Sequence, residues 1–323
     1  MKIIEPSVEI MRTGLETETV TPEQFIERVG RTCYKSEDKI TDDSAAKFVG
    51  NIIKRGHEAV VEHWSLIFKT DRDYYYRFVY EWNYILHNCD KYKDEHLRPF
   101  LRFTDYTAKD GEERYIVSGN MRAWRDFIGA YIQKFGHLAR YLHGIVRSHP
   151  LFFPEYLVYT PEIFFNDILV PISVNDLTAI ERKIHQDVTV KFICDRGVSH
   201  EIVRHRVASF AQESTRYCNY SQAKFDHEIT VVRPSWCNKG NDRYKRWFEG
   251  CLNAENGYFS LLDEGCTPQE ARSVLPNSLK TEVVVTMNLE GWQHFFNLRC
   301  SPAAHPDMQE VANMTRELFG QLV

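Results

Sequence analysis

Apolar positions near the N-terminus recur with helical spacing and are bounded by capping residues. Thr21 lies three residues before Gln24, which is the order of a capping box, and Gly30 suits the exit of that helix. A second helix is expected over residues 43–54. The run 64–70 that follows is rich in bulky apolar residues and predicts a strand.

Patterned segments return in the C-terminal half of the chain. Residues 188–194 predict a strand, and the apolar positions within 198–203 that follow it have helical spacing. Residues 281–289, TEVVVTMNL, predict a buried strand. Residues 307–322 predict a closing amphipathic helix.

Residues 71–186 differ in character from both flanks. The stretch is rich in aromatic residues and contains a polar loop, TDYTAKDGEER, and an apolar run interrupted by prolines. Large aromatic side chains are ordinary core material, so we expect them to pack a core rather than bind a cofactor. We predict one domain over residues 1–323, with residues 71–186 as an inserted helical subdomain.

One internal similarity links the insertion to the C-terminal half. VSGNMRAWRDF (117–127) and VTMNLEGWQHF (285–295) share Val, Asn, Trp and Phe at matching offsets. Chance and a duplicated element both account for such a match. No fixed period is sustained along the chain, so this is not a repeat protein.

The composition describes a globular chain without a general attraction for polyanions. The 323 residues are 43% hydrophobic, and 40 Lys plus Arg stand against 45 Asp plus Glu, a net charge of −5. That balance argues against nucleic acid or an anionic membrane as a partner. The N-terminal residues lack the pattern of a signal or transit peptide, and the eight cysteines contain no C-x-x-C pair. We therefore expect a cytoplasmic protein with free thiols.

Phosphate-binding chemistry is concentrated in one segment, RHRVASFAQESTRY, residues 204–217. On a continuing helix Arg204 and Arg206 would lie about 200° apart, so either they serve different groups or the helix ends before them. One alternative is an exposed helix end that neutralises its own charges. The hydroxyl, amide and guanidinium donors that follow favour a loop that wraps a phosphate.

This segment resembles the signature of flavin-dependent thymidylate synthases, which reads R-H-R, seven further residues and a serine, followed by Arg and Tyr. The matching residues here are Arg204, His205, Arg206, Ser214, Arg216 and Tyr217. Similar segments occur in the family's order at 31–36 (RTCYKS), 56–63 (GHEAVVEH), 271–277 (ARSVLPN), 285–288 (VTMN) and 297–299 (NLR). The insertion lies outside the compact core of this family.

The resemblance implies an α/β (α+β) fold with a central, mostly antiparallel sheet flanked by helices. It also implies a homotetramer with shared sites and the reductive methylation of dUMP to dTMP. Methylenetetrahydrofolate would donate the carbon, FAD would carry the electrons and NADPH would reduce the flavin. The family does not use a cysteine nucleophile, and we predict no metal site in this chain.

The resemblance assigns residues to each ligand. Those implied for FAD are Arg204, His205, Arg206, Gln212, Asn288 and His294. Those implied for the nucleotide are Glu201, Arg204, Gln212, Glu213, Ser214, Thr215, Arg216, Arg272 and Arg299. Arg299 would stabilise negative charge on the pyrimidine, and Ser214 would lie near the reacting carbons, so we expect these two to be catalytic.

Several positions depart from the family pattern. Glu201 stands where some members have glutamine, and Ala59 and Ala303 also differ. Glu290 occupies the place of an arginine that helps to hold FAD, where a carboxylate would repel a pyrophosphate. As a hypothesis, Arg122 in the segment GNMRAWR replaces that contact.

Two other functions stay open from the sequence. The cationic segment would serve a nucleotide- or RNA-binding module without flavin redox activity if the departures had abolished FAD binding. A metal-dependent phosphohydrolase would use His57 and His63 with neighbouring carboxylates. The six-residue spacing of these histidines does not place them on one helical face. A structural role, or the flavin contact that the family resemblance implies around this motif, is therefore favoured over a metal site.

Overall fold

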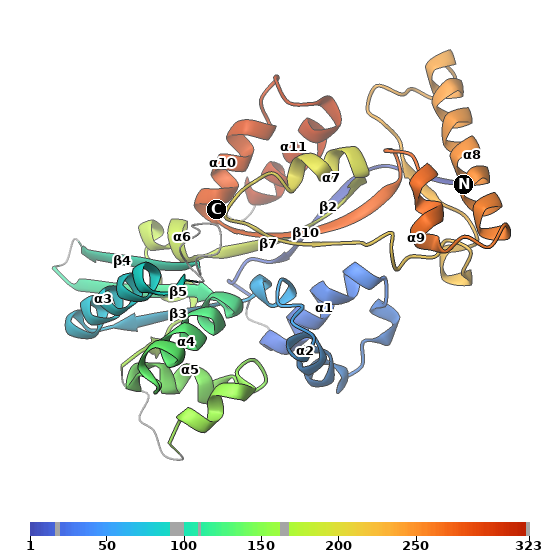
Figure 1. The fold of residues 1–323 in the computed structure, drawn as a ribbon. Coiled ribbons are helices and arrows are strands. Elements are labelled where there is room, and N and C mark those ends of the chain that lie inside the picture. Colours follow the sequence, from blue (N-terminus) through green and yellow to red (C-terminus); the bar gives the residue numbers. More distant parts are fainter. Residues whose placement is uncertain (17–19, 91–99, 109–110, 162–167, 321–323) are drawn as a thin grey trace. The chain divides into compact units, whose positions relative to one another are not determined.

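The computed structural model describes residues 1–16, 20–90, 100–108, 111–161 and 168–320. The chain divides into two compact units, whose elements are labelled in Figure 1. Unit 1 comprises residues 1–12, 28–39 and 188–323, and unit 2 comprises residues 13–27 and 40–187. Helix α1 (Pro22–Tyr34) begins in unit 2 and ends in unit 1.

A four-stranded sheet organises unit 1. Its order is β2 (Ser7–Arg12), β7 (Asp187–Asp195), β10 (Lys280–Asn288) and β8 (Ser209–Gln212). β2 pairs with β7 and β8 pairs with β10, and both pairs are antiparallel. Helices α7 (Arg196–Ile202), α10 (Leu289–Arg299) and α11 (Pro306–Gly320) cover one face (Figure 1). Phe192, Trp292, Phe295 and Val311 are buried between these helices and the sheet.

A smaller layer extends unit 1. Here β1 (Lys2–Ile4) pairs in parallel with β9 (Thr230–Val232). These strands pack with α8 (Asp242–Asp263) and α9 (Pro268–Ala271) around Tyr220, Tyr258 and Leu279. A short 3₁₀ turn, Arg272–Val274, follows α9 and lies against the segment after β8.

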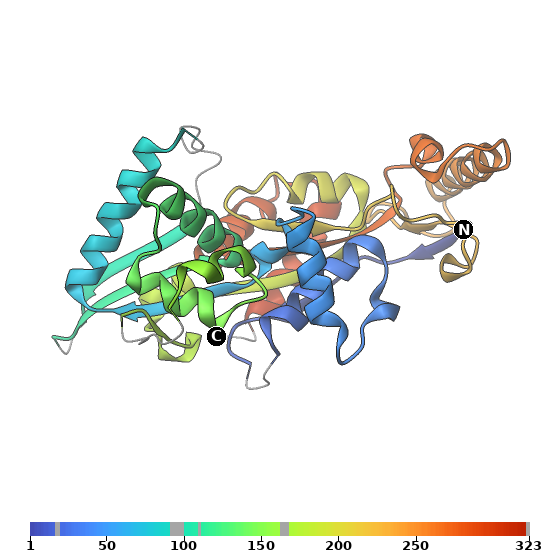
Figure 2. The ribbon, with the colours of Figure 1, turned by 60° about the horizontal axis from the view of Figure 1, so that its bottom comes forward.

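Unit 2 has an antiparallel sheet of its own. Its order is β4 (Leu101–Thr107), β5 (Glu113–Asn120), β3 (Ser65–Thr70) and β6 (Val170–Pro171). Helices α3 (Arg72–Asn88), α4 (Met121–Phe135) and α5 (His143–Ser148) cover one face, as Figure 2 shows, and α2 (Ser44–Lys54) joins their core. Helix α6 (Ala179–His185) lies on the opposite face, where His185 contacts Ser118.

Many sequence-based expectations are confirmed. The fold is α/β with mostly antiparallel sheets, and strands occur at the three places where the apolar runs predict them. The capping box forms, since Gln24 N–H donates to Thr21 Oγ1 (3.3 Å) and Thr21 N–H donates to Gln24 (3.1 Å). The helix it starts continues past Gly30 to Tyr34.

Two segments differ from their expectations. The insertion is not wholly helical, because a hairpin, β4 and β5, occupies the place of the predicted polar loop. Tyr115 and Val117 face the core, whereas Arg102 and Arg114 lie on the other face of the hairpin and pair with Asp187 and Glu181. The segment after R-H-R is likewise half strand, since Ala211 pairs with Val284 of β10.

One strand–helix plan occurs in both units. β5 ends at Asn120 and β10 ends at Asn288, and each asparagine side chain accepts a hydrogen bond from the backbone N–H three residues on. Four residues after each asparagine lies a fully buried tryptophan, Trp124 or Trp292, whose indole N–H donates to a strand carbonyl. The sheet orders β3–β5–β4 and β7–β10–β8 also correspond, because in each the strand that comes last in the sequence lies between the other two. The similarity of the two sequence segments therefore marks a shared local structure.

Candidate active site

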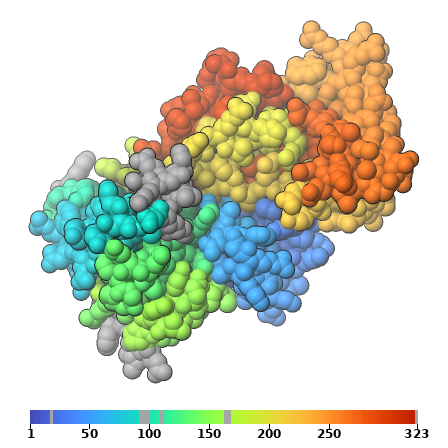
Figure 3. Space-filling model, viewed as in Figure 1, coloured from blue at the N-terminus to red at the C-terminus, as the bar shows by residue number. Residues whose placement is uncertain are grey.

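Helix α7 ends immediately before the R-H-R segment. Asp195 caps its start by accepting from Val198 N–H (2.6 Å), and the helix stops at Ile202. Arg204 and Arg206 are exposed, whereas His205 between them is only 6% exposed. The helix therefore ends before both arginines, and the three side chains have different environments. Figure 3 shows this part of the chain, in yellow, on the surface of unit 1.

Arg299, the last residue of α10, connects His205 to Glu201. Its Nε–H donates to Nε2 of His205 (2.9 Å), an Nη1–H donates to Oε2 of Glu201 (2.7 Å) and an Nη2–H donates to the Glu201 backbone carbonyl (3.1 Å). The side chains of Glu201 and Arg299 are 27% and 20% exposed. Three predicted site residues thus form one hydrogen-bonded cluster with an accessible edge.

The protonation state of His205 follows from this contact. A guanidinium only donates hydrogen bonds, so Nε2 of His205 must accept and the ring proton lies on Nδ1. Burial, together with the charges of Arg299 and His294, lowers the pKa of His205 to about 4. The ring is therefore neutral at pH 7, and its Nδ1–H has no acceptor among the described residues.

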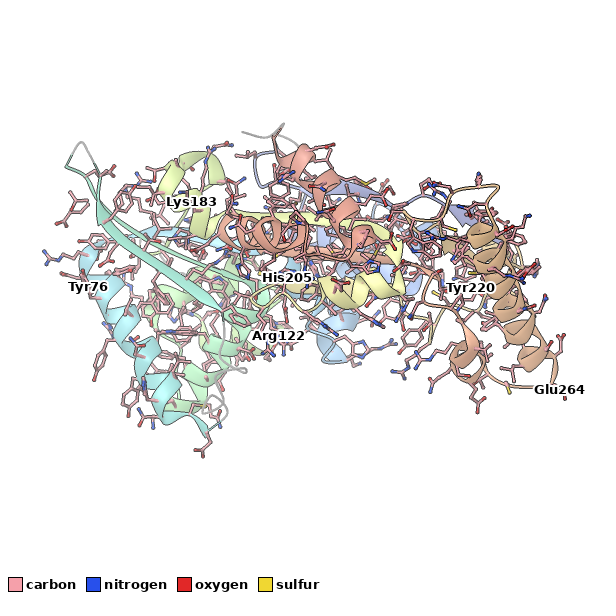
Figure 4. The ribbon with its side chains drawn as sticks, turned by 90° about the horizontal axis from the view of Figure 1, so that it is seen from above. Tyr76, Arg122, Lys183, His205, Tyr220 and Glu264 are labelled. Carbon is pink, nitrogen blue, oxygen red and sulfur yellow. The ribbon has the colours of Figure 1, made fainter. Side chains whose placement is uncertain are left out.

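Helix α10 carries the other residues predicted for the flavin. Asn288 caps the helix by accepting from Gly291 N–H (2.9 Å), and Glu290 is exposed in the first turn. The His294 ring centroid lies 6.3 Å from that of His205, which Figure 4 labels. α10 therefore brings both His294 and Arg299 to the same imidazole.

A second cluster lies beyond the other end of β8. Nη1 of Arg272 donates to Thr215 Oγ1 (3.2 Å), and Nε of Arg216 donates to Gln269 Oε1 (3.2 Å). Ser214 Oγ accepts from the backbone N–H of Arg216 (3.3 Å). Two guanidinium groups and two hydroxyls around one turn suit an anion such as a phosphate.

Strand β8 separates the two clusters. It has four residues and lies between His205 and Ser214 in the sequence. Four residues of strand span about 13 Å. Within one chain, the groups predicted for the pyrimidine and those predicted for the phosphate therefore lie at opposite ends of β8.

Two predicted ligand contacts turn their side chains toward protein partners. Nε2 of Gln212 donates to the hydroxyls of Ser199 (2.9 Å) and Thr281 (3.2 Å). Glu213 is 3% exposed, and its carboxylate accepts from Nζ of Lys280 (2.8 Å). Their contacts with ligands stay predictions.

A buried ion network that the sequence does not predict lies beside Glu213. Glu282 pairs with Lys35 (2.8 Å), Lys191 (3.1 Å) and Lys280. Burial alone would raise the pKa of Glu282, but the charges of Lys280 and Lys35 lower it to about 2. The only local indication of this network in the sequence is the pair Lys280 and Glu282, which are two residues apart and therefore lie on the same side of a strand. A cavity of about 400 Å³ opens here, lined in part by Lys35, Glu213 and Lys280.

The remaining candidates lie in unit 2. His57 is exposed and His63 is buried, and nowhere in the described ranges do three or more His, Cys, Asp or Glu side chains gather so as to hold a metal ion. Arg122, labelled in Figure 4, donates to Glu62 (2.6 Å) and lies 3.7 Å from Asp126, so two carboxylates flank it. As far as the structure describes the chain, no helix is long and apolar enough to cross a membrane.

Comparison with known proteins assigns the chain to a family. The family described as "Thymidylate synthase complementing protein" matches residues 15–73 and 183–323, which is more than half of the chain. The chain belongs to this family. Every residue predicted for FAD or the nucleotide lies within the second matched range, whereas Arg122 lies between the two.

Curated relatives of this chain match part of its length. A flavin-dependent thymidylate synthase of Pyrococcus horikoshii is 39% identical over 119 residues, 37% of this chain and 48% of the relative. Another, of Geobacter sulfurreducens, is 34% identical over 152 residues, 44% of this chain and 64% of the relative. The chain thus spans less than two thirds of the length of these relatives.

One solved structure with similarity is the UMP/dUMP methylase PolB of Streptomyces cacaoi bound with 5-Br dUMP. It is 23% identical, covers 43% of this chain and 67% of its own, and has a TM-score of 0.35.

Proposed function

We propose that this protein catalyses the reductive methylation of dUMP to dTMP. Methylenetetrahydrofolate is the carbon donor, FAD is the redox cofactor and NADPH reduces the flavin. The observation that carries the proposal is the cluster of Arg299, His205 and Glu201 in a member of the thymidylate synthase complementing protein family. The names of the curated relatives support the same reaction.

The residues predicted for FAD fit such a cofactor. Arg204 is an exposed cation suited to a pyrophosphate, and the Nδ1–H of neutral His205 is a donor for a ring carbonyl or ring nitrogen. Glu290 at the start of α10 is an unfavourable charge in the same region. When bound, the reduced flavin would supply the hydride that converts the transferred methylene into a methyl group.

Arg299 acts on the pyrimidine in this proposal. Glu201 and His205 hold its guanidinium in one orientation, so it stabilises negative charge on the ring without first reorganising. At the other end of β8, Arg216 and Arg272 bind the 5′-phosphate as permanently charged donors, with Ser214 beside them. Together these groups orient the nucleotide for attack by C5.

The positions of the two clusters, at opposite ends of β8, favour a site that is shared between subunits. One nucleotide would have to extend along all of β8 to use both clusters of a single chain. We therefore propose a homotetramer in which different subunits supply the phosphate and pyrimidine groups. Eight unpaired cysteines support a reducing, cytoplasmic location.

The test is the formation of dTMP from dUMP by purified protein with FAD, NADPH and methylenetetrahydrofolate, each omitted in turn. The proposal requires product only in the complete mixture and flavin absorbance that NADPH bleaches. Colourless protein that binds nucleotide or RNA and forms no dTMP would support the binding module instead.

A further inference from the structure

The Arg299 guanidinium has unused donors on its accessible edge. Of its five N–H groups, three are taken by His205 Nε2, by Oε2 of Glu201 and by the Glu201 carbonyl. The described residues leave two N–H groups without an acceptor, one on each terminal nitrogen. The Arg299 side chain is 20% exposed, so part of it is open to a ligand.

Glu201 places an unused acceptor beside those donors. Its Oε2 is bonded to Arg299, whereas its Oε1 has no donor among the described residues. An ionised carboxylate accepts hydrogen bonds and donates none. The edge of this pair therefore presents an acceptor next to N–H donors, and neither group can exchange these roles.

We infer that Glu201 determines the specificity of the site for uracil over cytosine by accepting the N3–H of the base. This inference rests on the proposed function, in which Arg299 meets the pyrimidine. Uracil carries an N3–H donor between two carbonyl acceptors, which matches Oε1 of Glu201 beside the N–H groups of Arg299. Cytosine has an acceptor at N3 and an amino donor at C4, so its N3 lone pair would face the carboxylate oxygen.

A glutamine at this position would not discriminate in the same way. The terminal amide carries both a carbonyl and an NH₂, and rotation by about 180° exchanges them. In Glu201→Gln the carbonyl oxygen can take the place of Oε2 and accept from Arg299, so that the NH₂ faces the base and donates to the N3 lone pair of cytosine. The carboxylate of Glu201 excludes this pairing with cytosine.

The experiment measures dUMP and dCMP binding to flavin-loaded protein by calorimetry. Wild type should bind dUMP about 100-fold more tightly than dCMP, because one charged hydrogen bond is replaced by a repulsion. Glu201→Gln should narrow this ratio at least tenfold, mainly by tighter dCMP binding. Glu249→Gln is the matched control, because Glu249 also pairs with an arginine, Arg246, but lies exposed on α8. Its ratio should equal that of wild type.

A second measurement uses wild-type protein alone, so it does not depend on the folding of a variant. A methyl group on N3 of dUMP removes the donor, and affinity should fall at least tenfold. Unchanged affinity for N3-methyl-dUMP, or an unchanged dUMP to dCMP ratio in folded Glu201→Gln, would overturn the role of Glu201. Selective dUMP binding without dTMP formation would instead contradict the proposed reaction and leave the selectivity of Glu201 intact.

Discussion

Arg299 donates its Nε–H to Nε2 of His205 across 2.9 Å, and this bond determines which imidazole nitrogen carries the proton. An ordinary histidine exchanges its proton between the two nitrogens and takes up a second proton near pH 6.5. Here the arginine occupies one nitrogen as a donor and adds a positive charge beside the ring. Both effects keep the ring neutral with its proton on Nδ1.

His205 should therefore remain neutral well below pH 6.5. Since burial and the neighbouring charges lower its pKa to about 4, the unfolded chain takes up a proton between pH 6.5 and 4 that the folded protein does not. The contribution of this residue to stability is present above about pH 6.5 and is lost as the pH falls through that window. Nitrogen-15 NMR should show one tautomer, protonated at Nδ1, at pH 7 and at pH 5.5.

Arg299→Gln is the control for that measurement. It removes the guanidinium charge, and the pKa of His205 should move back toward its ordinary value. A ring that titrates near pH 6.5 in the wild type would contradict the neutral assignment.

Arg299→Ala should keep the fold and lose most turnover. One preorganised donor to a developing negative charge is worth about 10²–10³ in kcat. The change should appear in kcat, measured by dTMP formation, with an unchanged circular dichroism spectrum. Arg316→Ala is the control, because Arg316 lies exposed on α11 and donates to Asn313. An effect confined to KM would show that Arg299 binds the ground state of the substrate and does not stabilise the transition state.

Arg272→Ala should weaken nucleotide binding with little change in kcat. Its guanidinium lies against Thr215, at the end of β8 that we assign to the phosphate. Loss of one charged hydrogen bond costs about 1.5–3 kcal/mol, which corresponds to roughly 10- to 150-fold in affinity for dUMP. Deoxyuridine, which has no phosphate, should bind wild type and variant equally. A variant that loses affinity for both compounds would show that Arg272 does not read the phosphate.

Glu282→Gln should destabilise unit 1. The variant leaves Lys35, Lys191 and Lys280 without their shared carboxylate, and removal of one partner from a buried ion pair costs about 3–5 kcal/mol. The lysines are partly exposed, so the loss should lie at the lower end of that range, measured by urea unfolding at pH 7.

The pH dependence tests the same network. With its pKa lowered from 4.5 to about 2, Glu282 contributes stability above pH 4.5 and loses it as the pH falls toward 2. Wild type should therefore lose more stability than Glu282→Gln between these pH values. Parallel curves for the two proteins would show that the network is electrostatically unimportant.

Asn288→Ser should separate the capping role of this residue from its predicted flavin contact. A serine still caps α10, so the free energy of unfolding should change little, whereas loss of the amide should weaken FAD binding. Asn288→Ala should lose the cap as well, at a cost of about 1 kcal/mol. Asn120→Ala is the matched control, because Asn120 caps α4 in the same way and should affect stability alone.

Arg122 lies two residues after Asn120, so its own contribution to FAD binding has to be measured with a separate variant. Arg122→Ala should leave FAD affinity unchanged if its carboxylate partners hold it as a structural residue. Weaker FAD binding in this variant would support the hypothesis that it replaces the arginine absent at Glu290.

Local signals predicted local structure. The capping box at Thr21 and the apolar run 281–289 specify a helix start and a buried strand without help from distant residues. The hairpin β4–β5 was not predicted, because its polar residues have partners that are distant in the sequence. Arg114, for example, pairs with Glu181, 67 positions away, and without such partners the segment resembles a polar loop. The alternation of apolar and polar residues in this segment covers too few positions to predict a strand.

Site residues were recognisable as a motif, but not their contacts. Arg299 and Glu201 are separated by 98 positions in the sequence, and Lys35 and Glu282 by 247. Only the pairing of strands and the packing of α7 against β10 bring such groups together. For the same reason the sequence does not show that Lys280, on a neighbouring strand, donates to the carboxylate of Glu213, whose contact with the nucleotide stays a prediction.

The paired arrangement of asparagine cap and buried tryptophan has a consequence for how the protein unfolds. Each unit contains a sheet and a hydrophobic core of its own, and each core contains one of these tryptophans. We therefore expect each unit to show a cooperative transition of its own on denaturation. The chain crosses between the units four times, at residues 12/13, 27/28 (within α1), 39/40 and 187/188. Fluorescence from variants that retain either Trp124 or Trp292 would report the unfolding of each unit separately.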